Sequence, residues 1–302
     1  MAQKISSNKA VWTSFLVDLG DIILNVTVMI LTGSAVMLAE AFEGLSDLVA
    51  SGLLLIGLRK SKLRPNKKHP FGFGKSLFFW TLISAIVMLL FGGGLSIYFG
   101  VQRFLHPEEI EKIYLAFGAV SISIITNGYA FSVSMRRLLE KEKITNFFKI
   151  FLTTTHVETK NTLILDFTGM ASAVIGLISL ILYKFAKVEY FDAVGAILIG
   201  VIIAISSVML IFGVKDYLVG KTATTETEES IRKSILKLDE VDEVIDLDTM
   251  YIGSEKLLVH LGVNVKLANP KNPEQIINQI KEHLRKEIPI VYFIQIEIKK
   301  IL

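Results

Sequence analysis

Six stretches of this chain are apolar over about 20 residues, and their length restricts the fold more than any other feature of the sequence. A helix of about 20 apolar residues crosses the hydrocarbon core of a bilayer. Because every backbone polar group must be satisfied inside lipid, we expect each stretch to form a transmembrane α-helix. The predicted spans are Val11–Leu31, Ser34–Leu58, Leu77–Gly100, Ile113–Val133, Thr162–Phe185 and Phe191–Val214.

The loops between these stretches differ in charge. Residues 59–75 hold seven Lys and Arg and no acid, and residues 136–160 hold six more, whereas residues 101–112 hold two basic residues and three glutamates. Because Lys and Arg are enriched in cytoplasmic loops, we expect both termini and the even-numbered loops to be cytoplasmic. The sequence therefore predicts a multi-pass protein of the cell membrane.

Beyond Val214 the sequence changes to a soluble pattern. A capping box from Thr225 to Glu228 opens one predicted helix, and Asn272 followed by Pro273 opens another. Apolar residues alternate as in strands near Val244–Ile252, in LLVHLGVNVK and in FIQIEIKKI. The predicted fold is an α-helical membrane bundle of six helices over residues 1–214, followed by an α+β domain over residues 215–302. That domain has the order αββαβ, which is ferredoxin-like or metallochaperone-like.

Composition and motifs exclude several functions. The chain has no cysteine, which excludes disulfides, thiolate metal ligands and thiol catalysis. Its net charge of +3 gives no reason to expect a nucleic-acid partner. No nucleophile–base arrangement, phosphate loop or nucleotide motif appears, so neither an enzyme nor a bound cofactor is predicted. The FGGGLS segment of the third span is better explained by close helix packing than by ligand binding.

Four of the carboxylates in the predicted spans can converge at one depth. Glu43 and Asp47 are four residues apart, so they share one face of a helix. Asp166 lies near the start of the fifth span. Asp21 is 12 residues before Gly33, while Glu43 and Asp47 are 10 and 14 residues after it. With ~1.5 Å of rise per residue, a hairpin about Gly33 places Asp21 at a height between them.

These acids need a positive partner. A carboxylate at membrane depth costs at least ~2.5 kcal/mol on insertion scales, and the first two spans carry no Lys or Arg. Clustered acids without a basic partner bind protons or a cation, and one divalent cation coordinated by carboxylate oxygens would account for all four. Metal and protons would then compete for the same lone pairs. For Asp18 a structural role as a hydrogen-bonded side chain is an equally good interpretation.

The residues around these acids resemble a known family. The segments TGSAVMLAEAFEGLSD and HPFGFGK, with an Asp in the fifth span followed by VIGL, resemble the cation diffusion facilitators. LILDFTGMASAVIG is most similar to the branch that contains the mitochondrial zinc transporter of animals. The resemblance covers nearly the whole chain. It implies a homodimeric antiporter of divalent metal ions and protons, with residues 1–214 as the transport domain and residues 215–302 as a cytoplasmic dimerisation domain.

The resemblance also implies a transport site made from two residues of the second span and two of the fifth. On this chain the four positions fall on Glu43, Asp47, Thr162 and Asp166. Thr162 departs from the family pattern, because most members have His or Asp there and a hydroxyl is a poor zinc ligand. Asp21, Asn161 or water would have to complete the site.

The accessory metal sites of the family are altered in this chain. His69 is kept in the basic loop, but the position four residues on is Phe73, so we expect His69 to be a turn residue. Tail positions that carry His and Asp in relatives hold other residues here, and His260 and His283 do not match them. We therefore expect the tail to dimerise without much metal.

Two function classes remain open. One is efflux of a divalent metal, with zinc as the family expectation and manganese, iron or cobalt suited to an all-oxygen site. The other is a membrane scaffold or metal sensor that transports nothing, which the departure at Thr162 keeps open.

Overall fold

The computed structural model describes residues 7–139, 144–147, 150–151, 157–266 and 272–301, with side chains from Leu19 onward in the first helix. The chain divides into two compact units. The first contains the membrane-length helices, and the second contains residues 56–79 and the described residues from Val214 onward. The side chain of Asp18 and the loop lysines 141, 143 and 149 lie outside the described part.

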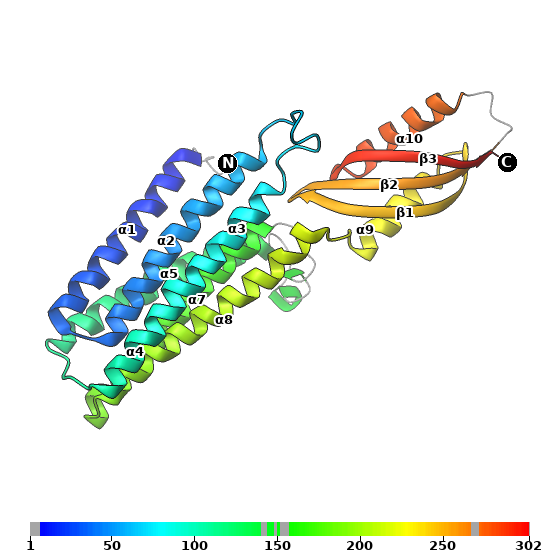
Figure 1. Ribbon diagram of the computed structural model, residues 1–302. Helices are drawn as coiled ribbons and strands as arrows, with labels where there is room; N and C mark the ends of the chain where they lie inside the picture. Colours follow the sequence, from blue (N-terminus) through cyan, green and yellow to red (C-terminus); the bar gives the residue numbers. More distant parts are fainter. Residues whose placement is uncertain (1–6, 140–143, 148–149, 152–156, 267–271, 302) are drawn as a thin grey trace, which may run out of the picture. The chain divides into compact units, whose positions relative to one another are not determined.

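The first unit is a bundle of long apolar helices, labelled in Figure 1. Five candidate spans, α2, the run Ser76–Leu105, α5, α7 and α8, are long and apolar enough to cross a membrane. The described apolar part of α1 is the shorter segment Leu19–Thr32, so the sixth span stays a prediction. The elements are α1 (Ser7–Thr32), α2 (Ala35–Ser61), α3 (Ser76–Val87), the π-helix η1 (Met88–Gly94), α4 (Leu95–Leu105), α5 (Ile113–Leu139), α7 (Val157–Ala186) and α8 (Tyr190–Val219).

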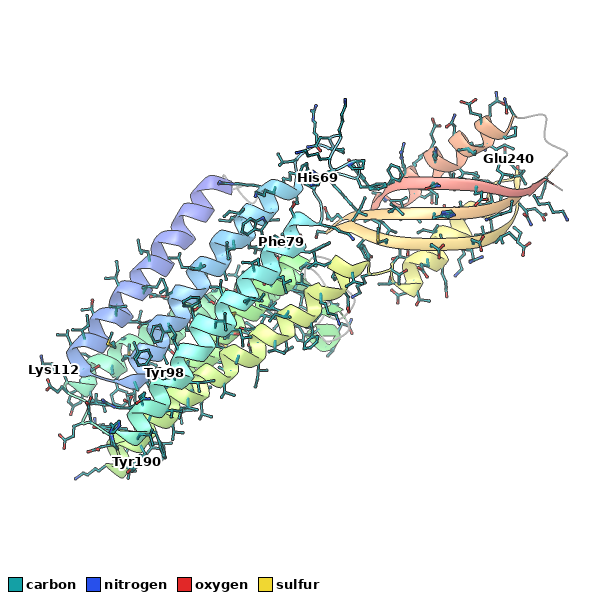
Figure 2. All side chains as sticks on the ribbon, viewed as in Figure 1. His69, Phe79, Tyr98, Lys112, Tyr190 and Glu240 are labelled. Atoms are coloured by element: carbon teal, nitrogen blue, oxygen red, sulfur yellow. The ribbon has the colours of Figure 1, made fainter. Side chains whose placement is uncertain are left out.

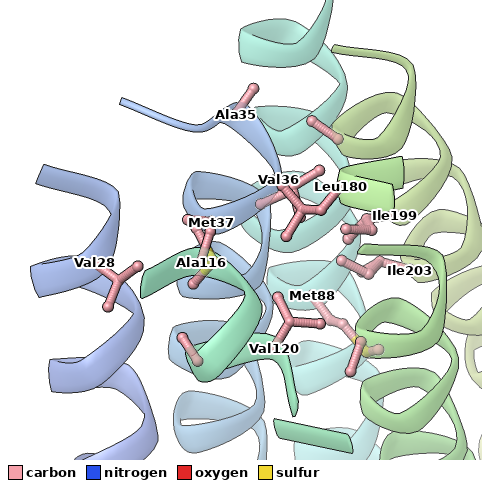
Figure 3. Close-up of a cluster of buried hydrophobic side chains, with 14 of the residues drawn as sticks. Val28, Ala35, Val36, Met37, Met88, Ala116, Val120, Leu180, Ile199 and Ile203 are labelled. Atoms are coloured by element: carbon pink, nitrogen blue, oxygen red, sulfur yellow. The ribbon is translucent and has the colours of Figure 1, made fainter. Parts of the chain in front are cut away.

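One apolar cluster joins the helices of the bundle. Figure 3 shows its side chains pointing toward one another from α1, α2, η1, α5, α7 and α8. Because these side chains are removed from solvent and lipid alike, close packing holds them together. The buried members that Figure 3 labels include Val28, Val36, Met37, Met88, Val120, Leu180, Ile199 and Ile203.

Glycines bring the backbones of two helices into close approach. A Cβ atom built on Gly200 of α8 would lie 2.8 Å from the backbone nitrogen of Ile97 and 2.9 Å from the carbonyl oxygen of Gly93. A Cβ on Gly100 of α4 would lie 2.9 Å from the backbone nitrogen of Ile197. Small residues allow such contacts between membrane helices. The FGGGLS segment therefore serves helix packing, as the sequence predicted.

The N-terminus of α2 is capped by a residue from the start of α8. The fully buried Asp192 accepts hydrogen bonds from Ser34 Oγ at 2.6 Å, from the backbone N–H of Ala35 at 2.7 Å and from that of Val36 at 3.1 Å. Arg103 Nε lies 3.6 Å from the same carboxylate. The carboxylate thus satisfies amides that the helix leaves without an internal partner.

We expect Asp192→Asn to destabilise the folded bundle. The amide keeps the size but loses the charge that faces Arg103, and it replaces one acceptor oxygen with a donor. Leaving buried donors unsatisfied costs about 1–3 kcal/mol. Thermal unfolding of the purified variant in detergent should show a lower midpoint than the parent, whereas Asp216→Asn, at the exposed end of α8, should match the parent. Equal midpoints for both variants would contradict this role.

The second unit contains a three-stranded mixed sheet with two helices. Strand order is β1-β2-β3, with β1 and β2 antiparallel and β2 and β3 parallel. Helix α9 packs on β1, α10 packs on β3, and the two helices contact each other. The order αββαβ agrees with the prediction. The bounds are α9 (Thr225–Ile235), β1 (Val241–Gly253), β2 (Lys256–Val265), α10 (Pro273–Glu287) and β3 (Val291–Ile301).

One of the two predicted helix caps is right and the other is displaced. Asn272 caps α10 within a full capping box, as predicted. The capping box from Thr225 is wrong, because Thr224 is the N-cap of α9 and accepts from the backbone N–H of Thr227. The Glu228 carboxylate accepts instead from the hydroxyls of Thr222 at 2.6 Å and Thr249 at 2.7 Å. These contacts hold the Glu228 carboxylate outside the predicted capping box.

Candidate functional site

A polar cavity lies between α1, α2 and α5 inside the bundle. Its volume is about 40 Å³, enough for one water molecule or one ion, since water occupies ~30 Å³ in the liquid. Eight residues from the three helices line it. They are Asp21 and Asn25 of α1, Glu40, Glu43, Gly44 and Asp47 of α2, and Ser123 and Asn127 of α5.

The cavity brings together three of the carboxylates that the depth count placed at one level. Asp21, Glu43 and Asp47 all line it. The α1–α2 turn is centred on Gly33, whose φ of 65° favours glycine. Asp21 Oδ2 accepts a hydrogen bond from Thr126 Oγ1 at 3.1 Å, so α5 as well as α2 faces this acid. The hairpin count therefore agrees with the structure.

Glycines of α7 make room for the buried glutamates of α2. Glu40 and Glu43 are only 1% and 5% exposed. A Cβ atom on Gly169 would lie 2.9 Å from Glu43 Oε1, and one on Gly176 would lie 3.7 Å from Glu40 Oε1. Residue numbers fall along α7 as they rise along α2, so the two helices are antiparallel.

Asp166 and Thr162 lie on α7 and are not among the residues that line the cavity. Ser134 Oγ of α5 donates a hydrogen bond to Asp166 Oδ2. Thr162 Oγ1 donates to the carbonyl oxygen of Glu158 in its own helix at 3.0 Å. Among the described residues, no three His, Cys, Asp or Glu side chains are grouped closely enough to hold a metal ion. The five predicted site residues thus separate into a set of three at the cavity and a pair on α7.

Asp47 and Asp166 nevertheless lie at a similar depth. Glu43 is next to Gly169, and from this contact Asp47 is four residues along α2 while Asp166 is three residues back along α7. In antiparallel helices these steps run in the same direction, by ~6 Å and ~4.5 Å. The two carboxylates therefore differ little in depth along the bundle.

Four of the cavity residues were not predicted as site residues from the sequence: Asn25, Glu40, Ser123 and Asn127. A signal for three of them was present. Asn25 is four residues after Asp21, and Asn127 is four residues after Ser123. Both pairs have the spacing that drew attention to Glu43 and Asp47, and polar pairs at this spacing share one helix face.

The histidines outside the bundle do not form a cluster with other ligands in the described residues. His69 lies in the α2–α3 connection (Figure 2), where its backbone N–H donates to the carbonyl oxygen of Asn66 at 3.1 Å and its ring centroid lies 4.3 Å from that of Phe73. It is a turn residue, as predicted. In the tail, His260 Nε2 is 4.0 Å from Glu297 Oε2, and His283 Nε2 is 3.1 Å from the carbonyl oxygen of Ser234.

Comparison with known proteins identifies a matching family model and several relatives of this chain. A family model described as the cation efflux transmembrane domain matches residues 11–219. The chain is 27% identical over 230 residues to the proton-coupled zinc antiporter SLC30A9, mitochondrial, of Mus musculus, which covers 76% of this chain and 41% of the relative. The human protein of the same name is also 27% identical over 230 residues, with 76% of this chain and 40% of the relative covered. The chain thus spans about two fifths of the length of these relatives.

A bacterial relative matches over more of its own length. The chain is 25% identical to the manganese efflux system protein MneS of Bacillus subtilis over 271 residues, which cover 86% of this chain and 84% of the relative. The names of these relatives thus refer to two different metals, zinc and manganese.

Proposed function

This chain belongs to the cation efflux family of metal cation transporters, the cation diffusion facilitators, and on that premise we propose that it exports divalent metal ions in exchange for protons. It is a multi-pass membrane protein related to the branch of the animal mitochondrial zinc transporter. The observation that carries the proposal is the cavity lined by Asp21, Glu40, Glu43 and Asp47. No Lys or Arg occurs in 19–32, 35–58 or 113–135, the helix segments around it.

We assign the cargo ion to a position between α2 and α7. Glu43, Asp47 and Asp166 would supply carboxylate oxygens, and Asp21 and Thr162 are the further candidates. Metal binding would replace the hydrogen bond that Ser134 donates to Asp166. Because protons and metal compete for the same oxygens, protonation of the carboxylates from the opposite side of the membrane would release the ion. Rocking of the helices around a site near the bilayer midplane is the usual form of such transport.

Zinc is the ion that we propose. The relatives named for zinc support it, while the relative named for manganese and the oxygen-only residues around the cavity make manganese the main competitor. Iron(II) and cobalt are further substrates to test.

The membrane topology, location and oligomeric state follow from the same proposal. We propose α1 as the sixth span, cytoplasmic termini, a location in the cell membrane and a homodimer joined through residues 215–302. The seven basic residues of the 59–75 loop support this orientation. The sheet and helices of the tail provide a folded surface for dimerisation.

Flux measurements on purified protein in liposomes test the function. With an imposed pH gradient, we expect uptake of zinc or manganese, reported by a trapped metal indicator, and movement of protons in the opposite direction. Collapsing the gradient should stop accumulation. A chain that binds metal but moves neither metal nor protons would overturn the proposal in favour of a scaffold or sensor.

We expect Thr162→His to shift the preference from manganese toward zinc by on the order of tenfold, since imidazole is a better zinc ligand than a hydroxyl. The position is one turn from Asp166 on α7. Competition titrations with the two metals measure the shift, and Thr159→His, three residues earlier on the same helix, serves as a control. An unchanged preference would show that residue 162 does not reach the ion.

A further inference from the structure

We propose that the cavity between α1, α2 and α5 is a second binding position for a divalent cation, formed by oxygen ligands only. It lies beside the α2–α7 position and shares Glu43 and Asp47 with it. We call it the α1-side site and define it by Asp21, Asn25, Glu40, Ser123 and Asn127. The inference rests on the proposed function, because the cation would be the transported ion at another step of its path.

The first evidence is a set of buried oxygen atoms without hydrogen-bond partners. Asn25, Glu40 and Ser123 are 4%, 1% and 1% exposed. Asn25 Oδ1, Glu40 Oε1 and Ser123 Oγ accept or donate no hydrogen bond among the described residues. A buried polar group that is left unsatisfied destabilises the fold. The three residues come from three helices and line one cavity. A single cation there would take Asn25 Oδ1 and Ser123 Oγ as ligands, with the Glu40 carboxylate as its charged partner from α2.

The second evidence is the charge of the site. Asp21, Glu40, Glu43 and Asp47 supply carboxylates, and Asn25, Ser123 and Asn127 add neutral oxygen ligands. A divalent cation would offset part of this negative charge, and carboxylate, amide and hydroxyl oxygens are the ligands that hard ions such as Mn²⁺ prefer. The cavity volume of about 40 Å³ leaves room for an ion or for water.

The position differs from the one between α2 and α7. Glu43 Oε1 lies against Gly169, whereas Glu40 is three residues nearer the N-terminus of α2, or ~4.5 Å along its axis. Asn25 and Ser123 belong to α1 and α5, whereas the three carboxylates proposed for the α2–α7 position belong to α2 and α7. An ion that leaves Glu43 and Asp47 toward that end of α2 would reach the α1-side site next.

Titration of the full-length protein in detergent with Mn²⁺ alone, followed by electron paramagnetic resonance, tests the site. We use Asp166→Asn as the background, because it weakens the α2–α7 position and leaves the α1-side site intact. This variant should still bind Mn²⁺. Adding Glu40→Gln or Ser123→Ala should weaken the remaining binding by at least ~10-fold, the lower end of the loss seen when even an outer-shell partner of a metal is removed.

Ser172→Ala on the same background is the matched control. Ser172 of α7 is fully buried, and its hydroxyl likewise has no partner among the described residues, but it does not line the cavity. Its titration should overlay that of Asp166→Asn. Ser123→Ala removes no described side-chain hydrogen bond, so without metal its unfolding midpoint should equal or exceed that of the parent.

The outcomes separate this inference from the proposed function. Titrations of the Glu40 and Ser123 variants that overlay the background would mean that the cavity holds only water, and the inference would fail while metal flux by the parent stands. Loss of all Mn²⁺ binding in Asp166→Asn would also overturn it. Binding at the α1-side site in a chain without metal flux would refute the proposed function alone.

Discussion

Replacing Asp47 by alanine should reduce proton-driven metal flux at least ~100-fold, to the level of empty liposomes. Asp47 lines the cavity one turn from Glu43 and lies at the depth of Asp166. Removing it takes away a carboxylate that both proposed ion positions can reach, and the loss should exceed that for an outer-shell partner. The measurement is zinc and manganese uptake into liposomes under a fixed pH gradient.

The control for this experiment is Asp239→Ala, which removes an exposed acid of the tail. That variant should transport at the parent rate. Size-exclusion elution and the unfolding midpoint of Asp47→Ala should match those of the parent, since Asp47 is only partly buried and its removal takes away a negative charge beside three other carboxylates. Parental flux in Asp47→Ala would mean that the site is assigned to the wrong residues.

Of all the proposed variants, Gly200→Ala should destabilise the folded bundle most. The added methyl would lie 2.8 Å from the backbone nitrogen of Ile97 and 2.9 Å from the carbonyl oxygen of Gly93. Backbone atoms cannot rotate away, so η1 and α4 would have to separate from α8. Overpacking of this kind costs about 1–3 kcal/mol and occasionally more. We expect a lower unfolding midpoint and reduced yield of folded protein.

Gly213→Ala is the matched control in the same helix. A Cβ atom on Gly213 would meet nothing within 4 Å, and alanine is the better helix former by up to ~1 kcal/mol. This variant should therefore be as stable as the parent or slightly more stable. If Gly200→Ala unfolds at the same temperature as Gly213→Ala, the close backbone contact does not contribute to stability.

The depth of side chains along the spans was predictable from the sequence because the rise per residue of a helix is regular. Counting residues from Gly33 placed Asp21 between Glu43 and Asp47, and the three residues line one cavity. The secondary structure of the tail was predictable for a similar reason. Apolar residues that alternate along a strand and an Asn-Pro start of a helix both depend on local backbone geometry. The order αββαβ and the Asn272 cap agree with the structure.

Rotation about the helix axes could not be predicted in the same way. Hydropathy gives the length of a span but not the neighbour that each side chain faces. Thr162 was assigned to the site through the family resemblance, and in the structure its hydroxyl donates to the carbonyl oxygen of Glu158. The π-helix at Met88–Gly94 was missed because an apolar run with three glycines looks like any other span. The shift of the α9 cap to Thr224 depends on contacts of Glu228 that are not local in the sequence.

The cap on α2 has a consequence for biosynthesis. Ser34 and the Asp192 that binds it are 158 residues apart, and the ribosome makes the N-terminal residue first. At ~5–20 residues per second, α2 waits for roughly 8–30 seconds before its cap exists. During that interval the first amides of α2 have no carboxylate to accept from them. The α1–α2 hairpin therefore cannot reach its final state until the last spanning helix has been synthesised.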